Sequence, residues 1–286
     1  MRRDEKRGVI ENIKDAEGEV FMECKRTIYD LGVQSGYGKV HDRKRITIRE
    51  MCMVCVGIVV AGGKGRRMAT NVSKQYLDLG GRPILARTLQ ALSAAAVVDK
   101  IVLIVPRGDV VFCKDQIVEK YHLDKVVRVA MGGQTRQESV ARGLRAIEKL
   151  RLVPDVVLVH DGVRPFIDPQ VVTRAVRTAA TFGASVVAAA VKETIKLITD
   201  DGFVRQTPDR RWLVAAQTPQ AFQYATLLDA HREAEKTGFV GTDDCQLVER
   251  IGGQVIVVNG DDTNIKITTQ TDLLLAQAMW KQRKAT

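Results

Sequence analysis

Short apolar runs rich in β-branched residues recur along the chain from Met51 onward, separated by longer segments of mixed polarity. Continuous runs of this kind are typical of strands buried on both faces. Strands that alternate with helix-length segments indicate a mostly parallel sheet covered by helices on both faces. We expect strands at 56–60, 101–105, 156–159, 185–191 and 254–258, and helices at 84–96, 136–150, 169–182, 242–251 and 271–282.

One segment, residues 192–214, departs from this alternation. It holds two β-type runs separated by Asp200-Asp201-Gly202, and an Asp-Gly pair between such runs is a strong hairpin signal. An isolated hairpin is only marginally stable in water. We therefore expect a protruding arm at about 192–214 that packs on a partner chain.

Residues 1–50 differ in composition from the remainder. They mix charges of both signs with few apolar residues in no sustained period, and they lack the pattern of a signal or transit peptide. We interpret them as a poorly ordered N-terminal extension, followed by a single domain at 51–286. A start-site artefact and a genuine partner-binding arm remain as alternatives.

Net charge narrows the choice of partners. The chain carries +10, yet its Lys and Arg residues are spread out and its aromatic fraction is only 5%. A nucleic-acid-binding surface would concentrate basic residues and interleave aromatics. The longest apolar run, 51–61, is about half of the ~20 residues that span a bilayer. We expect a cytoplasmic protein with neither nucleic acid nor membrane as a partner.

The cysteines carry little functional information. There are five, an odd and scattered set that argues against a disulfide framework. Cys52 and Cys55 form a single C-x-x-C pair, which could be a redox pair or half of a zinc site. No second pair accompanies it, so we favour small residues that enter the first strand.

A Gly-rich segment at 61–68, Ala-Gly-Gly-Lys-Gly-Arg-Arg-Met, directly follows the first expected strand. Glycines let backbone N–H groups approach a phosphate. The dinucleotide fingerprint fails because Met68 stands in place of the third Gly, and no Gly-Lys-Ser/Thr completes a P-loop. With Lys74 downstream, the segment suits a nucleoside triphosphate attacked at its α-phosphorus. The alternative is a Gly-rich turn without a ligand.

Two further motifs follow expected strands. Asp161 ends one strand and could hold Mg²⁺ or its waters, because Mg²⁺ uses few carboxylates and takes substrate phosphates as well. Arg164 could accept a phosphate or cap the loop, and we interpret His160 as structural. The turn at 132–140 opens a helix, a natural place for an anion or polar ligand, although Gln134 and Ser139 could simply cap that helix.

The last two motifs are weaker. Thr242 is the expected N-cap of the helix that follows it, with acidic residues in the first turn. Lys266 alternates with Ile265 and Ile267 and so points away from them. By itself it could be a snorkelling surface residue.

Together these motifs resemble the 2-C-methyl-D-erythritol 4-phosphate cytidylyltransferase family of the non-mevalonate isoprenoid pathway, over about residues 54–280. The resemblance rests on 61–68 with Lys74-Gln75, 132–140, 160–165, 194–196, 217–220, 242–244 and 264–268. It implies a three-layer, Rossmann-like nucleotidyltransferase fold with a protruding β-hairpin arm for dimerisation. The implied reaction transfers CMP from CTP to 2-C-methyl-D-erythritol 4-phosphate, with Mg²⁺ or another divalent cation as cofactor and a homodimer as the assembly.

The resemblance also implies roles for individual residues. Arg67 and Lys74 would stabilise charge on the α-phosphate, while Arg210 and Lys266 would position the acceptor's phosphate. Arg210 would reach the partner subunit's site from the arm, although Arg211 beside it is an alternative. Cytosine and ribose contacts would come from Ala61, Gly62, Gly63, Gly65, Gly133, Gln134 and Ser139, and sugar-phosphate contacts from Asp161, Arg164, Thr194, Thr218 and Thr242.

Some positions depart from the family pattern, and other functions were considered beside it. Gly62 replaces a more usual Ala, Gln134 a frequent Asp, and Gly162-Val163 a common Ala-Ala. The nearest rival is a ribitol 5-phosphate cytidylyltransferase, which 194–196 and the Arg136…Ser139 spacing disfavour. A non-catalytic nucleotide-binding protein would be expected to lose Arg67, Lys74 or Lys266, and a nicotinamide dehydrogenase would need the third Gly.

Overall fold

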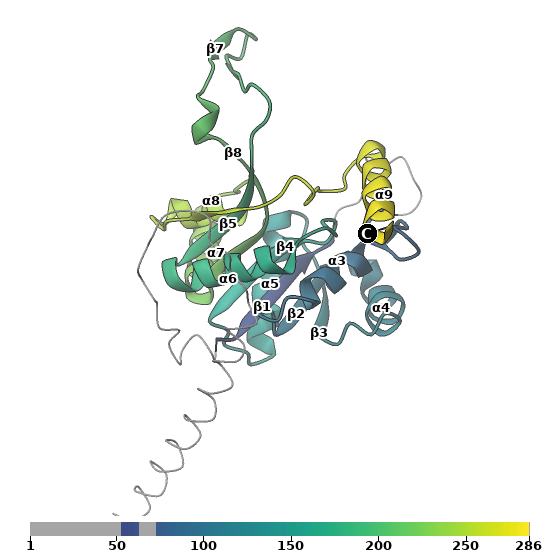
Figure 1. Ribbon diagram of the computed structural model, residues 1–286. Coiled ribbons are helices and arrows are strands. Elements are labelled where there is room, and N and C mark those ends of the chain that lie inside the picture. The colour runs from purple at the N-terminus through teal and green to yellow at the C-terminus, as the bar shows by residue number, and fades with distance from the viewer. Residues whose placement is uncertain (1–52, 63–72, 286) are drawn as a thin grey trace, which may run out of the picture. The chain divides into compact units, whose positions relative to one another are not determined.

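A mixed sheet forms the centre of the computed structural model, which describes residues 53–62 and 73–285 (Figure 1). Seven strands lie in the order β3-β2-β1-β4-β8-β5-β9. Only β8 runs antiparallel to its neighbours β4 and β5; the other pairs are parallel. The bounds are β1 Cys55–Val60, β2 Lys100–Val105, β3 Val126–Met131, β4 Val156–Asp161, β5 Ala184–Ala190, β8 Val214–Gln223 and β9 Ile256–Asn259. The expected mostly parallel sheet is confirmed.

Helices cover both faces of this sheet. One face carries α3 (Ile84–Ser93), α6 (Pro169–Phe182), α4 (Val110–Cys113) and the π-helix η4 (Lys114–Glu119), and the other carries α5 (Arg136–Lys149), α7 (Tyr224–Thr237) and α8 (Asp244–Arg250). Alternate strand residues point to opposite faces. In β1, Cys55 and Val59 therefore enter one core, and Val56 and Ile58 the other. This explains why the strands read as unbroken apolar runs.

A third, smaller core forms around the C-terminal helix α9 (Gln270–Ala285). Leu273 and Ala276 of α9 pack with Ile267 and with Phe166 from the loop after β4. This packing holds the strand-like stretch around Lys266 near the carboxyl end of β4. Three short 3₁₀ turns complete the description: η2 (Lys74–Tyr76), η3 (Arg107–Asp109) and η5 (Arg210–Trp212).

The predicted hairpin is confirmed as β6 (Leu197–Ile198) paired with β7 (Val204–Gln206). Gly202 closes its turn with a φ of +87°, a left-handed conformation that glycine adopts at no steric cost. The hairpin stands away from the central sheet (Figure 1). Its apolar side chains Phe203 and Trp212 are exposed, at 71% and 83%.

The expected helices and strands are all present within a few residues, and the differences have physical reasons. Helix α8 is capped by Asp243, whose carboxylate accepts from the Gln246 N–H at 3.0 Å, so the expected cap at Thr242 is wrong by one residue. Strand β8 was missed because Gln217, Pro219 and Gln220 break its apolar pattern. Strand β3, also missed, lies at the sheet edge and exposes Arg128.

Several expectations fall outside the described residues, namely the extension at 1–50 and residues Gly63, Gly65 and Arg67. Within the described part, Cys55 is fully buried in β1, and burial raises its pKa well above the usual range of a thiol. This supports the interpretation of Cys55 as a strand residue. No helix among the described residues is long and apolar enough to cross a membrane.

Candidate active site

A cavity of about 200 Å³ opens at the carboxyl ends of β1 and β4. Ligands of parallel α/β sheets bind in this position, where connections leave in opposite directions. The walls come from the end of β1, η2, the start of α5, the end of β4 and the stretch after β9. The predicted site residues that line it are Ala61, Gly62, Lys74, Gly133, Gln134, Ser139, Asp161 and Lys266.

Asp161 is the buried carboxylate of this cavity, and three cations surround it. Lys266 Nζ lies 2.9 Å from Oδ2, Arg164 Nε lies 3.5 Å from Oδ2, and Arg136 Nε lies 3.4 Å from Oδ1. Burial by itself would raise the pKa of Asp161. The charges of Lys266, Arg136 and Arg164 outweigh burial and hold that pKa well below its usual range.

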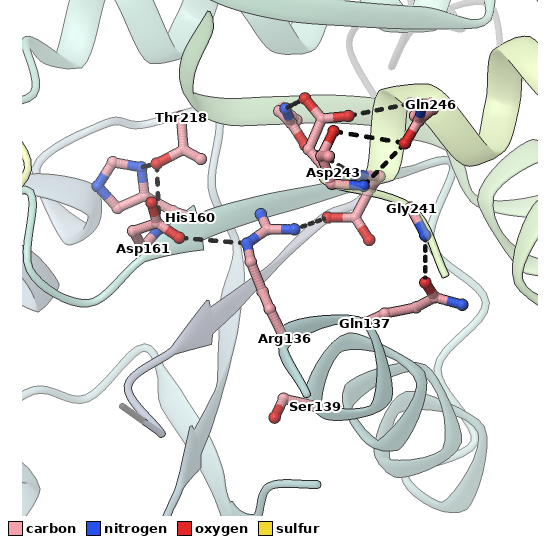
Figure 2. A network of polar contacts seen from close by, with 12 residues as sticks. Arg136, Gln137, Ser139, His160, Asp161, Thr218, Gly241, Asp243 and Gln246 are labelled. Atoms are coloured by element: carbon pink, nitrogen blue, oxygen red, sulfur yellow. Dashed lines mark hydrogen bonds and ion pairs between the residues drawn. The ribbon is translucent and has the colours of Figure 1, made fainter. Parts of the chain in front are cut away.

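Arg136 lies within the motif at 132–140, but no site role was predicted for it. It is the first residue of α5, where the helix dipole disfavours a cation. Two carboxylates compensate, because its Nη1 lies 2.6 Å from Asp244 Oδ2 while its Nε faces Asp161 (Figure 2). Its Nη2 is buried and has no hydrogen-bond partner in the described part of the chain. A cation at the first position of a helix is unfavourable by itself, so Arg136 could have indicated that a carboxylate or another anion lies beside it.

The series of polar contacts continues from Arg136 to Asp244 of α8 and then to His231 of α7. Asp244 is fully buried, and its second oxygen, Oδ1, accepts a hydrogen bond from His231 Nε2 at 3.0 Å. Burial would raise the pKa of Asp244, but the hydrogen bond from His231 and the charge of Arg136 lower it instead. The cluster therefore holds two carboxylates and the cations Arg136, Arg164 and Lys266, an excess of positive charge suited to a phosphate ligand.

His160 and Thr218 have structural roles beside the cavity. Thr218 Oγ1 accepts from the Asp161 N–H at 3.1 Å and contacts His160 Nδ1 at 3.1 Å (Figure 2). His160 Nε2 donates to the Arg164 carbonyl at 3.2 Å. Complete burial lowers the pKa of His160 to about 4, so the ring is neutral and Nδ1 accepts. The pair fixes the turn that presents Asp161.

The turn before α5 is held by its own hydrogen bonds. Thr135 caps the helix by accepting from the Glu138 N–H at 3.1 Å, so neither Gln134 nor Ser139 is the cap. Ser139 Oγ instead accepts from the Gly133 N–H at 3.1 Å and donates to the Thr135 carbonyl. A side chain at Gly133 would collide with Glu138. The turn can therefore keep this conformation only with glycine there.

Gln75 is a second residue whose site role was missed. Its side chain lines the cavity next to Lys74 and is 1% exposed. Neither of its amide atoms has a hydrogen-bond partner among the described residues. Burying an amide without partners costs free energy, and a polar ligand in the cavity would be one source of the missing hydrogen bonds.

The remaining predicted residues lie outside the cavity wall. Arg164 is buried and donates from Nη1 to the Asn264 carbonyl at 2.6 Å, which anchors the stretch that carries Lys266. Thr194 and Thr242 are exposed. Arg210 lies on the arm, exposed, with its Nη1 bonded to the Lys192 carbonyl.

Asp161, which was expected to hold Mg²⁺ or its waters, has both carboxylate oxygens paired with cations of the protein. No group of three or more His, Cys, Asp or Glu side chains within the described ranges could hold a metal ion. A divalent cation in direct contact with Asp161 would be repelled by Arg136, Arg164 and Lys266.

Comparisons with known proteins place this chain in one family. The family model of 2-C-methyl-D-erythritol 4-phosphate cytidylyltransferase matches residues 54–282. The enzyme of that name from Geobacter metallireducens is 45% identical over 231 residues, covering 81% of this chain and 99% of the relative. The one from Geotalea uraniireducens is 47% identical over 229 residues, covering 80% and 97%.

Solved structures agree with the sequence relatives. The crystal structure of 4-diphosphocytidyl-2C-methyl-D-erythritol synthase from Anaerococcus prevotii matches with a TM-score of 0.71 and 35% identity, covering 80% of this chain and 96% of that one. A 2-C-methyl-D-erythritol 4-phosphate cytidylyltransferase from Thermus thermophilus matches with a TM-score of 0.63 and 32% identity, covering 80% and 99%. The chain is a nucleotidyltransferase and belongs to the 2-C-methyl-D-erythritol 4-phosphate cytidylyltransferase family.

Proposed function

We propose that the cavity is where this chain carries out its family's reaction. CMP passes from CTP to 2-C-methyl-D-erythritol 4-phosphate, giving 4-diphosphocytidyl-2-C-methyl-D-erythritol and pyrophosphate. The observation that carries the proposal is the convergence of Lys74, Arg136, Asp161 and Lys266 on one cavity from four separate segments. Two anionic substrates need such an excess of fixed positive charge.

The nucleotide occupies the side of the cavity formed by the end of β1 and the turn before α5. Gly62 and Gly133 leave room for the ribose and base, and the exposed side chain of Gln134 is available to a base edge. Lys74 lies in the same wall and faces the phosphates. Arg67 adds its charge from the segment outside the described residues.

The acceptor occupies the side formed by Asp161 and Lys266. An oxygen of its phosphate attacks the α-phosphorus, a new P–O bond forms, and the bond to the pyrophosphate oxygen breaks. Positioning and charge neutralisation supply most of the catalysis in such transfers. No side-chain nucleophile is required. The divalent cation that the family resemblance suggests would arrive on the triphosphate, because Asp161 is already paired.

We propose further that the arm makes the enzyme a homodimer. The exposed apolar residues Phe203 and Trp212 suit burial against another chain. Arg210 lies between them in sequence, donates to the Lys192 carbonyl and is not among the residues that line the described cavity. Its proposed place is the active site of the partner subunit, where it holds the acceptor's phosphate.

Pyrophosphate release tests the proposed reaction. The purified chain should release pyrophosphate from CTP in the presence of 2-C-methyl-D-erythritol 4-phosphate, and slowly or not at all with ribitol 5-phosphate. Lys74→Ala should abolish the signal, and its thermal midpoint, measured alongside, shows that the variant is folded. Faster turnover of ribitol 5-phosphate would instead assign the sister activity, and normal turnover by Lys74→Ala would remove that lysine from the mechanism.

A further inference from the structure

We propose that His231 is a positioning residue for the acceptor side of the site. It acts through Asp244 and Arg136 on Asp161 and Lys266, and it touches neither substrate. The inference rests on the proposed function, since it assigns a further residue to that same reaction. Four contacts carry it, in which each polar group holds the next one in place.

The first contact is the hydrogen bond between His231 and Asp244, whose carboxylate has little freedom to rotate. Asp244 is 1% exposed and its two oxygens are both committed, Oδ1 to His231 and Oδ2 to Arg136. Its backbone N–H donates to Gln220 Oε1 at 3.2 Å. His231 therefore sets the rotation of the Asp244 carboxylate, and that rotation sets where Oδ2 meets Arg136.

The surroundings of His231 argue against simple packing. The buried face of α7 otherwise consists of Leu227, Ala230 and Ala234. A buried imidazole in such a face costs free energy unless a hydrogen bond compensates it. His231 also lines a second cavity of about 420 Å³ between α5 and α7, so its ring does not fill a tight core. The hydrogen bond to Asp244 is what the imidazole contributes.

The last links explain why a distant histidine would affect turnover. Arg136 Nε lies 3.4 Å from Asp161, the longest contact in the chain that runs from His231 to Lys266. If Asp244 turns, this contact weakens first. Asp161 then depends more on Lys266, whose ammonium is drawn toward the carboxylate and away from an incoming phosphate. A displacement of about 1 Å at a reacting group can slow a reaction by about a hundredfold.

Four variants separate positioning from folding. His231→Leu removes the donor at similar volume. His231→Gln restores a donor at the position of Nε2, and His231→Asn keeps polarity but falls short of Asp244. Glu235→Gln is the matched control, because Glu235 lies on the same helix and lines the same second cavity, and its only described ion pair is an exposed one with Arg145.

The readouts are kcat, the two KM values and the thermal midpoint. We expect His231→Leu and His231→Asn to lower kcat/KM for the acceptor by about ten- to a hundredfold, with the KM for CTP within about twofold of wild type because the nucleotide wall is untouched. His231→Gln should recover most of the loss, and Glu235→Gln should change nothing. Asp244→Asn combined with His231→Leu should be no worse than Asp244→Asn by itself, since both break one chain.

Two results would contradict the role of His231. The proposal fails if both His231→Leu and His231→Asn have the same kcat/KM for the acceptor as the wild type. It fails as well if every His231 variant, including His231→Gln, has a lower thermal midpoint together with higher KM values for both substrates. That result would indicate a packing defect. Should His231→Leu not fold, the comparison of Asn with Gln still decides. A wild-type chain inactive with CTP and the acceptor would refute the proposed function instead.

Discussion

The Lys266 ammonium lies 2.9 Å from the Asp161 carboxylate, so the stretch after β9 is tied directly to the carboxyl end of β4. Lys266 is 40% exposed at its side chain, whereas Asp161 is buried. The Lys266 ammonium is therefore accessible from the cavity, while the Asp161 carboxylate that holds it is fixed in the protein. A cation held in this way is ready for an incoming anion before the anion arrives.

Lys266→Ala should reduce turnover at least a hundredfold, because one fixed charge at a phosphoryl-type transition state is worth a factor of this size. Stability should change little, since Arg136 and Arg164 still neutralise Asp161. Initial rates of pyrophosphate release measure the effect. Lys281→Ala, on the exposed face of α9, is the control. Equal activity of the two variants would exclude Lys266 from the reaction.

Gln75→Leu should uncouple stability from activity. An apolar side chain of similar shape removes two buried amide atoms that have no described partner, and such a change is neutral or stabilising. The ligand-free thermal midpoint should stay the same or rise, while the KM for CTP or the acceptor rises. A midpoint lowered by several degrees, with unchanged kinetics, would show that the amide serves the protein and not the ligand.

His160 should make the fold sensitive to mild acid. Its pKa is about 4 when folded, against 6.5 for an unperturbed histidine. Because the folded pKa is depressed, the unfolded chain binds the proton first as pH falls. Stability is full above pH 6.5 and declines between 6.5 and 4, by about 2 kcal/mol at pH 5. Urea unfolding at pH 7 and pH 5 measures this, and His160→Asn should flatten the difference. An equal pH dependence in that variant would contradict the prediction.

Mixing inactive subunits tests the arm. If Arg210 serves the partner's site, then Lys74→Ala and Arg210→Ala chains are each inactive but complement each other in a mixed dimer. One site of such a dimer has its own Lys74 and receives Arg210 from the other chain. Random exchange should restore about a quarter of the sites. No recovery, in a preparation shown to contain mixed dimers, would place Arg210 in its own site.

The sequence was most informative where chemistry follows a strand directly. Asp161 and Ala61 end or follow unbroken apolar runs, and parallel strands bring their carboxyl ends to one edge, so both could be predicted to meet. The arm was also predictable, since Asp201-Gly202 identifies its turn.

Residues brought in by tertiary packing could not be found in this way. His231 and Asp244 lie on separate helices without a motif that joins them. Arg136 and Asp244 each fall within a motif of the family resemblance, but nothing in the sequence indicates that they form an ion pair. Gln75 was part of a motif, but it received no predicted role, because its lack of hydrogen-bond partners among the described residues is visible only in three dimensions. Strand β8 was hidden by Pro219, which reads as a break in an otherwise β-type run.

The two ends of the arm leave the sheet side by side, since Ala190 at the end of β5 pairs with Val214 at the start of β8. The residues between Ala190 and Val214 therefore leave the sheet and return to it at the same place. A tight turn could join the two strands with their register kept. The arm is therefore a modular part of this chain, and its removal should leave the sheet and the cavity intact.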